Sequence, residues 1–202
     1  MLLTSIYMDF WNFTLAIKNY DPEFRVDWNT IAGVFLQEAG TVLGYDAPLI
    51  LQDFNIIGSY AQSDADKELR KWTTSFLPKV KGVKIHFTER KKKKSGPRCP
   101  GCHALVNICP MCKSNMAGTE EKRNDTFITV SMIQDAWFKK VDVAILVSAD
   151  EDFIPAVNFI NNLGIKVIHA QFGSHGHNLS NACWGRFNIL QTLDRIKRNK
   201  PQ

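Results

Sequence analysis

Short apolar runs recur along the chain, and the most continuous of them is the run 143–147. A run without polar alternation is typical of a strand that is buried on both faces, as strands of parallel sheets are. We therefore predict a central strand at this position. Other apolar runs predict strands at 2–8, 47–57, 82–87 and 165–170, and the second of these is interrupted by Gln52 and Asp53.

Between these runs lie segments with the apolar spacing or the end signals of helices. They predict helices at about 31–39, 64–76, 125–137, 153–163 and 178–184. Gly40 and Gly164 are stop signals, while Asp152 and Pro155 suit the first turn of the fourth helix. Strands that alternate with helices predict an α/β fold, a three-layer sandwich with a mostly parallel central sheet.

The size and composition of the chain fit one such domain. With 202 residues, 45% of them hydrophobic, the chain can bury a sizeable core and still carry a small insert. No run approaches the roughly 20 apolar residues of a membrane helix, so no membrane is expected as a partner. The N-terminus has no signal-peptide pattern, which makes a cytoplasmic location the expectation.

The composition changes between residues 89 and 124, where Lys, Gly, Pro and Cys are abundant. We interpret this segment as an insert folded around metal, because so short a segment cannot build its own apolar core. Residues 1–88 and 125–202 would then form the main domain.

Positive charge is concentrated in the same part of the chain. Residues 88–124 hold nine basic and three acidic side chains and carry +6, whereas the whole chain carries +5. Such a local basic run indicates a polyanion partner, and a solvated loop is the alternative. The candidate contacts are Lys91, Lys92, Lys93, Lys94 and Arg98.

Two matching Cys-x-x-Cys pairs lie inside the insert, Cys99 with Cys102 and Cys109 with Cys112. Two such pairs supply four thiolates to a tetrahedral ion, which favours Zn²⁺ and leaves iron open. A pair of redox dithiols is the alternative. A closed four-thiolate site leaves no open position, so we assign it a structural role in ordering the basic loop.

Acidic residues follow the ends of two predicted strands. Asp9 follows the first strand, Asp150 and Asp152 follow the central strand, and Asp125 precedes a predicted helix. Ligands bind beyond the carboxyl ends of strands in open α/β sheets. If the two strands are neighbours, the acids could share a divalent cation that activates water beside a phosphate. The alternative assigns the same residues to turns and helix caps.

The motifs around these acids resemble those of the NYN family of PIN-like nucleases. One motif is hydrophobic-Asp-x-x-Asn, here from Asp9 to Asn12, and the other is Ser-x-Asp-x-Asp-Phe, here from Ser148 to Phe153. The resemblance covers nearly the whole chain except the cysteine insert. It implies a PIN-like fold and a Mg²⁺- or Mn²⁺-dependent ribonuclease with catalytic, metal-binding acids at Asp9, Asp150 and Asp152. It also implies substrate-binding or orienting roles for Asn12 and Ser148.

The sequence departs from the family in the helix before the central strand. Family members often carry a further acid there, where this chain has Ser131. Asp125 matches an earlier acid of the same segment, and Asp135 lies one turn beyond Ser131. Asp125 is the fourth candidate catalytic residue, and the choice among these three positions stays open.

Two functions follow from these patterns. The first is a metal-dependent endoribonuclease whose zinc-bound insert grips RNA, and the alternative is a catalytically inactive RNA-binding adaptor of the same fold. An insert that docks a protein, or a homo-oligomer, is left open. Among the remaining residues, Phe10, Trp11 and Phe13 are interpreted as core rather than base-stacking side chains, and His175 and His177 as loop histidines.

Overall fold

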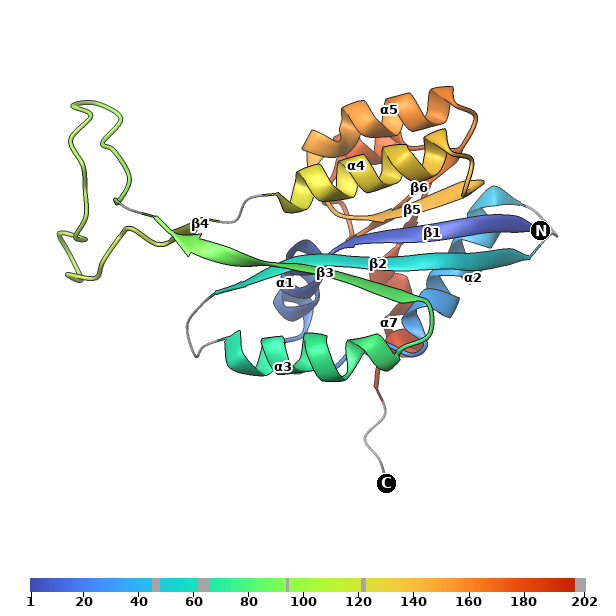
Figure 1. The fold of residues 1–202 in the computed structure, drawn as a ribbon, viewed down its shortest axis with the longest axis horizontal. Coiled ribbons are helices and arrows are strands. Elements are labelled where there is room, and N and C mark those ends of the chain that lie inside the picture. The colour runs from blue at the N-terminus through green and yellow to red at the C-terminus, as the bar shows by residue number, and fades with distance from the viewer. Residues whose placement is uncertain (45–47, 62–65, 94, 121–122, 199–202) are drawn as a thin grey trace.

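A seven-stranded sheet forms the centre of the computed structural model, which describes residues 1–44, 48–61, 66–93, 95–120 and 123–198 (Figure 1). The strand order is β4-β3-β2-β1-β5-β6-β7. Neighbouring strands are parallel except for β3 and β4. The strands are β1 (Leu2–Asp9), β2 (Leu49–Ala61), β3 (Val83–Lys92), β4 (Thr119–Glu120), β5 (Val143–Val147), β6 (Lys166–Gln171) and β7 (Gly185–Asn188).

Helices cover both faces of the sheet and give three layers (Figure 1). One face carries α1 (Phe10–Tyr20), α2 (Ile31–Leu43), α3 (Lys67–Ser75) and α7 (Leu193–Ile196), with 3-10 turns η2 (Leu77–Lys79) and η4 (Ile189–Thr192). The other face carries the turn η3 (Glu151–Phe153) and the helices α4 (Asn124–Trp137), α5 (Ile154–Asn162) and α6 (His177–Ala182). The predicted α/β class with a mostly parallel sheet is confirmed.

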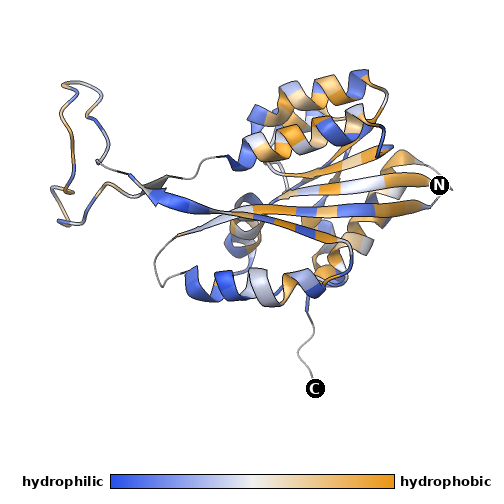
Figure 2. Cartoon of the chain, in the orientation of Figure 1, coloured by the Kyte–Doolittle hydropathy of each residue, from blue (hydrophilic) through white to orange (hydrophobic). Residues whose placement is uncertain are grey.

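The central strands explain why the run 143–147 lacks alternation. All five residues of β5 are buried. Val143, Ile145 and Val147 join the core on the α1 side, while Ala144 and Leu146 join the core on the α4 side. Each fully buried Val, Leu or Ile contributes about 1.5–3 kcal/mol, so both layers are held by the same short strand. Figure 2 shows hydrophobic residues along the central strands and also on the helices.

The order of the strands places the ends of β1 and β5 side by side. From β1 the chain builds β2 and β3 on one side, and after α4 it returns to build β5, β6 and β7 on the other. Met8 of β1 pairs with Val147 of β5 in parallel register. The reversal between β1 and β5 is a topological switch point, where open α/β sheets bind ligands at the carboxyl edge.

Several elements differ from the sequence prediction. Helix α1 and strand β7 were not predicted. Strand β2 continues through Gln52, because the register with β1 shifts there from Thr4–Leu51 to Ser5–Asp53 and leaves Gln52 as a bulge. Helix α2 runs past Gly40 to a left-handed cap at Gly44. Ala47 and Asp64, where two predicted elements began, lie outside the described residues.

Strand β3 also extends further than predicted. It continues through Lys92 and pairs with β2 as far as Arg90 and Ala61. The first residues of the predicted insert are therefore part of the sheet. Beyond them, the chain projects away from both helical layers and returns through β4 (Figure 1).

None of the helices in the described ranges combines the length and apolar composition that are needed to cross a membrane.

Candidate functional site

Asp9 lies at the junction of β1 and α1 and is fixed by the first turn of the helix. One carboxylate oxygen accepts hydrogen bonds from the backbone N–H of Trp11 at 3.0 Å and of Asn12 at 3.1 Å. A side-chain acceptor at this position satisfies helix donors that have no partner inside the helix. The helix that the sequence analysis missed is thus the element that orients the first predicted acid.

The loop after β5 carries the second acid. Asp150 Oδ1 accepts a hydrogen bond from the backbone N–H of Asp152 at 2.9 Å and caps the turn η3. The predicted cap at Asp152 was wrong, because helix α5 has Phe153 at its N-cap position without a side-chain cap, and the Asp152 side chain is exposed. Ser148 is buried, and its hydroxyl accepts from the Asp150 N–H at 3.2 Å.

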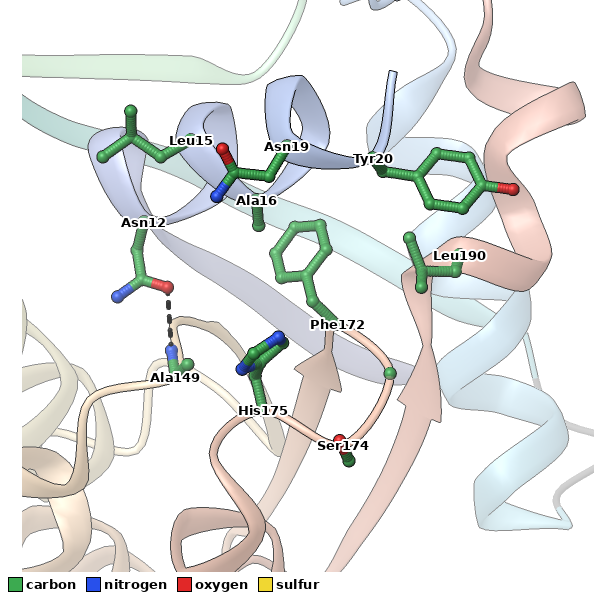
Figure 3. Close-up of a pocket in the computed structure, with 11 residues that line it drawn as sticks. Asn12, Leu15, Ala16, Asn19, Tyr20, Ala149, Phe172, Ser174, His175 and Leu190 are labelled. Carbon is green, nitrogen blue, oxygen red and sulfur yellow. Dashed lines mark hydrogen bonds between the residues drawn. The ribbon is translucent and has the colours of Figure 1, made fainter. Parts of the chain in front are cut away.

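Asn12 joins the two strand ends. Its side-chain oxygen accepts a hydrogen bond from the backbone N–H of Ala149 at 3.1 Å (Figure 3). This bond links the first turn of α1, which Asp9 caps, to the residue immediately before Asp150. We call this region, formed by Asp9, Asn12 and the residues 148–152, the carboxyl rim.

A buried histidine forms a hydrogen bond with the backbone of the carboxyl rim. The sequence did not predict this role. His169 of β6 lies 2.6 Å from the Ser148 carbonyl oxygen through Nε2 and 2.6 Å from the Ser180 hydroxyl through Nδ1. A carbonyl oxygen only accepts, so Nε2 carries the hydrogen. Burial lowers the pKa of His169. The hydrogen bond from Nε2 therefore holds the backbone that precedes Asp150.

The acids of helix α4 have different positions. Asp125 is exposed in the first turn of the helix. Asp135 accepts a hydrogen bond from the Tyr7 hydroxyl at 2.8 Å and lies 3.5 Å from the Lys140 ammonium. Burial and the neighbouring Asp135 raise the pKa of Tyr7. Asp135 thus has a structural role, and Ser131 is half-buried one turn before it.

The carboxyl rim offers carboxylate oxygens, which are the kind of donor that hard divalent cations prefer. Mg²⁺ is usually held by one or two carboxylates together with water and substrate phosphate. Backbone amides orient Asp9 and Asp150, as outer hydrogen bonds commonly do for metal ligands. Within the described ranges, no three His, Cys, Asp or Glu side chains lie close enough together to hold a metal ion. The donors fit a cation that shares its coordination with water and phosphate, not a closed cage.

The two cysteine pairs form hairpins with the same backbone. The N–H of Cys99 donates to the Ala104 carbonyl at 2.9 Å, and the N–H of Cys109 donates to the Ser114 carbonyl at 2.9 Å. The residue after each second cysteine is left-handed, with φ of 58° at His103 and 59° at Lys113. This ten-residue repeat was not recognised in the sequence.

Hydrogen bonds favour thiolates in both hairpins. Backbone donors and Cys102 lower the pKa of Cys99, and the Ser114 hydroxyl leads the causes that lower the pKa of Cys112 to about 7. Low thiol pKa values suit metal ligation. The four thiols do not converge on one point in the described structure, since no metal-binding group of three was found there. Cys183 is buried in the core, and burial raises the pKa of its thiol to about 12.

Basic side chains lie along the extension of β3. Lys91 and Lys93 are exposed, and Lys91 pairs with Glu120 of β4 through the backbone. Arg98 donates to the His103 carbonyl at 3.0 Å and so also supports the first hairpin. Lys94 lies outside the described residues, and the strand ends at Lys92.

A cation–aromatic contact connects this basic strand to the rim. The guanidinium of Arg90 lies 4.7 Å from the ring centroid of Trp11 and 3.3 Å from Asp66. The Trp11 indole N–H donates to the Ser59 carbonyl at 2.7 Å. Phe10 and Phe13 are buried, as predicted, whereas Trp11 is half-buried at the sheet edge. Sequence reasoning missed Arg90, because nothing in the sequence indicated that β3 reaches it.

A crystal structure of a Vibrio parahaemolyticus protein of unknown function superposes with a TM-score of 0.57 and 18% identity, over 98% of this chain and 96% of that chain. At this identity the likeness concerns the fold alone. No relative was found among the curated proteins.

The sequence profile of the NYN domain matches residues 4–190. This range includes most of β1, all of β5 and the carboxyl rim, and it confirms the resemblance seen in the sequence. NYN domains are generally ribonuclease-like, and the match suggests a PIN-like nuclease family. The chain belongs to the NYN domain family.

Proposed function

We propose that this NYN protein is a metal-dependent endoribonuclease. The observation that carries the proposal is the hydrogen bond from Ala149 to Asn12, which ties together the strand ends bearing Asp9 and Asp150. The two acids follow neighbouring parallel strands at the switch point of the sheet, where α/β folds bind ligands. Family membership supplies the expectation of RNA cleavage.

In this proposal Asp9 and Asp150 hold Mg²⁺ or Mn²⁺ together with water and phosphate, and the exposed Asp152 and Asp125 are further candidate ligands at the edge of the site. A bound ion would activate water and stabilise charge on the phosphate. The protein keeps the carboxylates in place through the helix α1 and turn η3 amides. Asn12 and Ser148 hold the loop that faces the substrate.

The insert, residues 89–124, is proposed as the RNA-binding segment. Zn²⁺ bound by Cys99, Cys102, Cys109 and Cys112 would draw the two hairpins together and order the basic segment. Lys91, Lys92, Lys93, Lys94 and Arg98 would contact phosphates. Residues 1–88 and 125–202 then form the nuclease domain. A cytoplasmic location belongs to the same proposal and is tested by cell fractionation.

Cleavage of a labelled RNA by the purified full chain in Mg²⁺ or Mn²⁺ tests the function. Asp150→Asn should lower the rate at least 10- to 100-fold, the usual loss when even an outer partner of a metal ligand is removed. The matched control is Asp194→Asn, which makes the same change at an exposed position in α7 and should cleave like the wild type. Equal cleavage by all three proteins would reject the site.

The second candidate is an RNA-binding adaptor without activity. It is favoured by one observation on helix α4, where Ser131 stands in place of an acid and Asp135 is bonded to Tyr7. An adaptor predicts RNA binding that is unaffected by Asp9→Asn and no metal-dependent turnover. Any turnover that requires both a divalent cation and Asp150 excludes it.

A further inference from the structure

A cavity of about 540 Å³ opens beside the carboxyl rim (Figure 3). Its size falls within the roughly 300–1,000 Å³ that is usual for small-ligand sites. The cavity lies between α1, the loop that follows β6 and the turn η4. Asn12 and Ala149, the pair that joins the two strand ends, form part of its wall. A ligand inside it would therefore lie next to Ala149, the residue that precedes Asp150.

The lining combines an aromatic floor with polar groups. Phe172 is buried at the base, and Ala16 and Leu190 lie beside it. Figure 3 shows the rings of Phe172 and His175 both directed toward helix α1. Polar partners are offered by the side chains of Asn12, Asn19, Ser174 and His175.

The charge of the cavity lining decides between charged and uncharged ligands. No Lys, Arg, Asp or Glu is among the described residues that line the cavity. A phosphate placed there would lack a cation, and buried charges without partners are costly. An uncharged ring with hydrogen-bonding edges matches the aromatic and amide lining. Proteins bind unpaired bases in this way, by stacking on aromatic rings and by hydrogen bonds to the base edges.

We propose that this cavity binds one unpaired nucleobase, from a nucleotide adjacent to the phosphate that the carboxyl rim acts on. The proposal rests on the proposed function, because it assumes that RNA reaches the rim. It adds a base-recognition subsite, in which the Asn19 and His175 side chains read the edge of the base. The phosphates stay outside, toward Asp150 and the basic strand.

Titration of the wild-type protein with the four nucleoside 5′-monophosphates, followed by NMR, tests the subsite without cleavage. Ribose 5-phosphate serves as the probe without a base. We expect the signals of Asn19 and His175 to shift with at least one nucleotide. The affinity for ribose 5-phosphate should be lower than the affinity for that nucleotide by about tenfold or more. Ala16→Phe fills the cavity and should weaken nucleotide binding about tenfold. Asn158→Phe, an exposed change on α5, is the matched control and should bind like the wild type.

Two results would overturn the subsite. One is equal binding of ribose 5-phosphate and the nucleotides, and the other is unchanged nucleotide binding by both Ala16→Phe and the exposed-site variant His175→Ala. The second variant guards against misfolding of the first. Cleavage of RNA without nucleotide binding in the cavity would reject the subsite alone. Nucleotide binding by a chain that does not cleave RNA would retain the subsite and reject the nuclease function.

Discussion

The acids of the carboxyl rim have a structural task as well as a proposed chemical one. Asp9 accepts from two backbone amides and Asp150 from one, so both acids cap a helix or helical turn, where the alternative interpretation of the sequence had assigned them to turns. A carboxylate has two oxygens and about four lone-pair positions. Capping therefore orients these groups without using all of their acceptor capacity, and the two tasks are compatible.

The buried His169 should make folding stability depend on pH. Because burial lowers its pKa below the ordinary value of 6.5, the unfolded chain binds a proton at higher pH than the folded chain. The contribution of His169 to the free energy of unfolding is thus complete above about pH 6.5, and it is lost as the pH falls toward the folded-state pKa of His169. In His169→Gln, an amide can replace Nε2–H but does not titrate. At pH 7.5 the free energy of unfolding of His169→Gln should be about 1 kcal/mol lower than that of the wild type. Between pH 7.5 and 5.5 it should decrease less than that of the wild type.

Urea unfolding at several pH values measures this difference. His86 also has a pKa lowered by burial, and it is present in both proteins, so its effect cancels. An equally steep loss of stability in the wild type and in His169→Gln would show that His169 does not cause the pH dependence.

At the scale of elements, the sequence predicted the long, regular pieces and missed those that depend on tertiary contacts. Strand β5 was predicted because an uninterrupted apolar run favours a buried strand, and β1 was predicted from the apolar residues on either side of Thr4 and Ser5. Helix α1 was missed because its Trp, Asn, Phe and Thr residues are weak helix formers, and it is stabilised by the Asp9 cap and by burial of Phe10, Phe13 and Ile17. Strand β7 has only four residues, too few for a periodic signal.

Substitutions at two separate glycines test how closely the loop after β6 packs against the carboxyl rim. Gly176 has a φ of 72°, and a Cβ there would lie 3.0 Å from the Ala149 Cα. Gly176→Ala should therefore destabilise the protein by roughly 1–2 kcal/mol. Gly40 lies inside α2, and a Cβ there would meet no atom within 4 Å. Gly40→Ala should stabilise by about 0.5–1 kcal/mol. Denaturant unfolding measures both, and equal effects of the two changes would contradict the structure.

The basic end of β3 should control the salt dependence of RNA binding. Removing two phosphate contacts with Lys91→Ala and Lys93→Ala should reduce the slope of log K against log salt by about 1.4 for single-stranded RNA. Lys79→Ala with Lys81→Ala removes the same charge near the opposite end of β3 and is the control. Zinc content, expected at one ion per chain, is measured in the same preparations. An unchanged slope would indicate that the insert contacts something other than RNA.

At the scale of the whole molecule, the sequence indicated a parallel sheet but not its strand order. Strands β1 and β5 are separated by more than a hundred residues, and their pairing depends on long-range packing that no local pattern encodes. For the same reason the acids could be proposed as neighbours but not placed. The position of Asp135 was equally unpredictable, since its partner Tyr7 comes from the other end of the chain.

The central claim is that acids from β1 and β5 share one divalent cation at the carboxyl rim. The most direct test is a crystal of the full chain soaked in Mn²⁺, with anomalous diffraction used to locate the ion. We expect a peak within ligand distance of both Asp9 and Asp150, which disappears in crystals of Asp150→Asn. A wild-type crystal with Mn²⁺ peaks elsewhere and none between these carboxylates would contradict it.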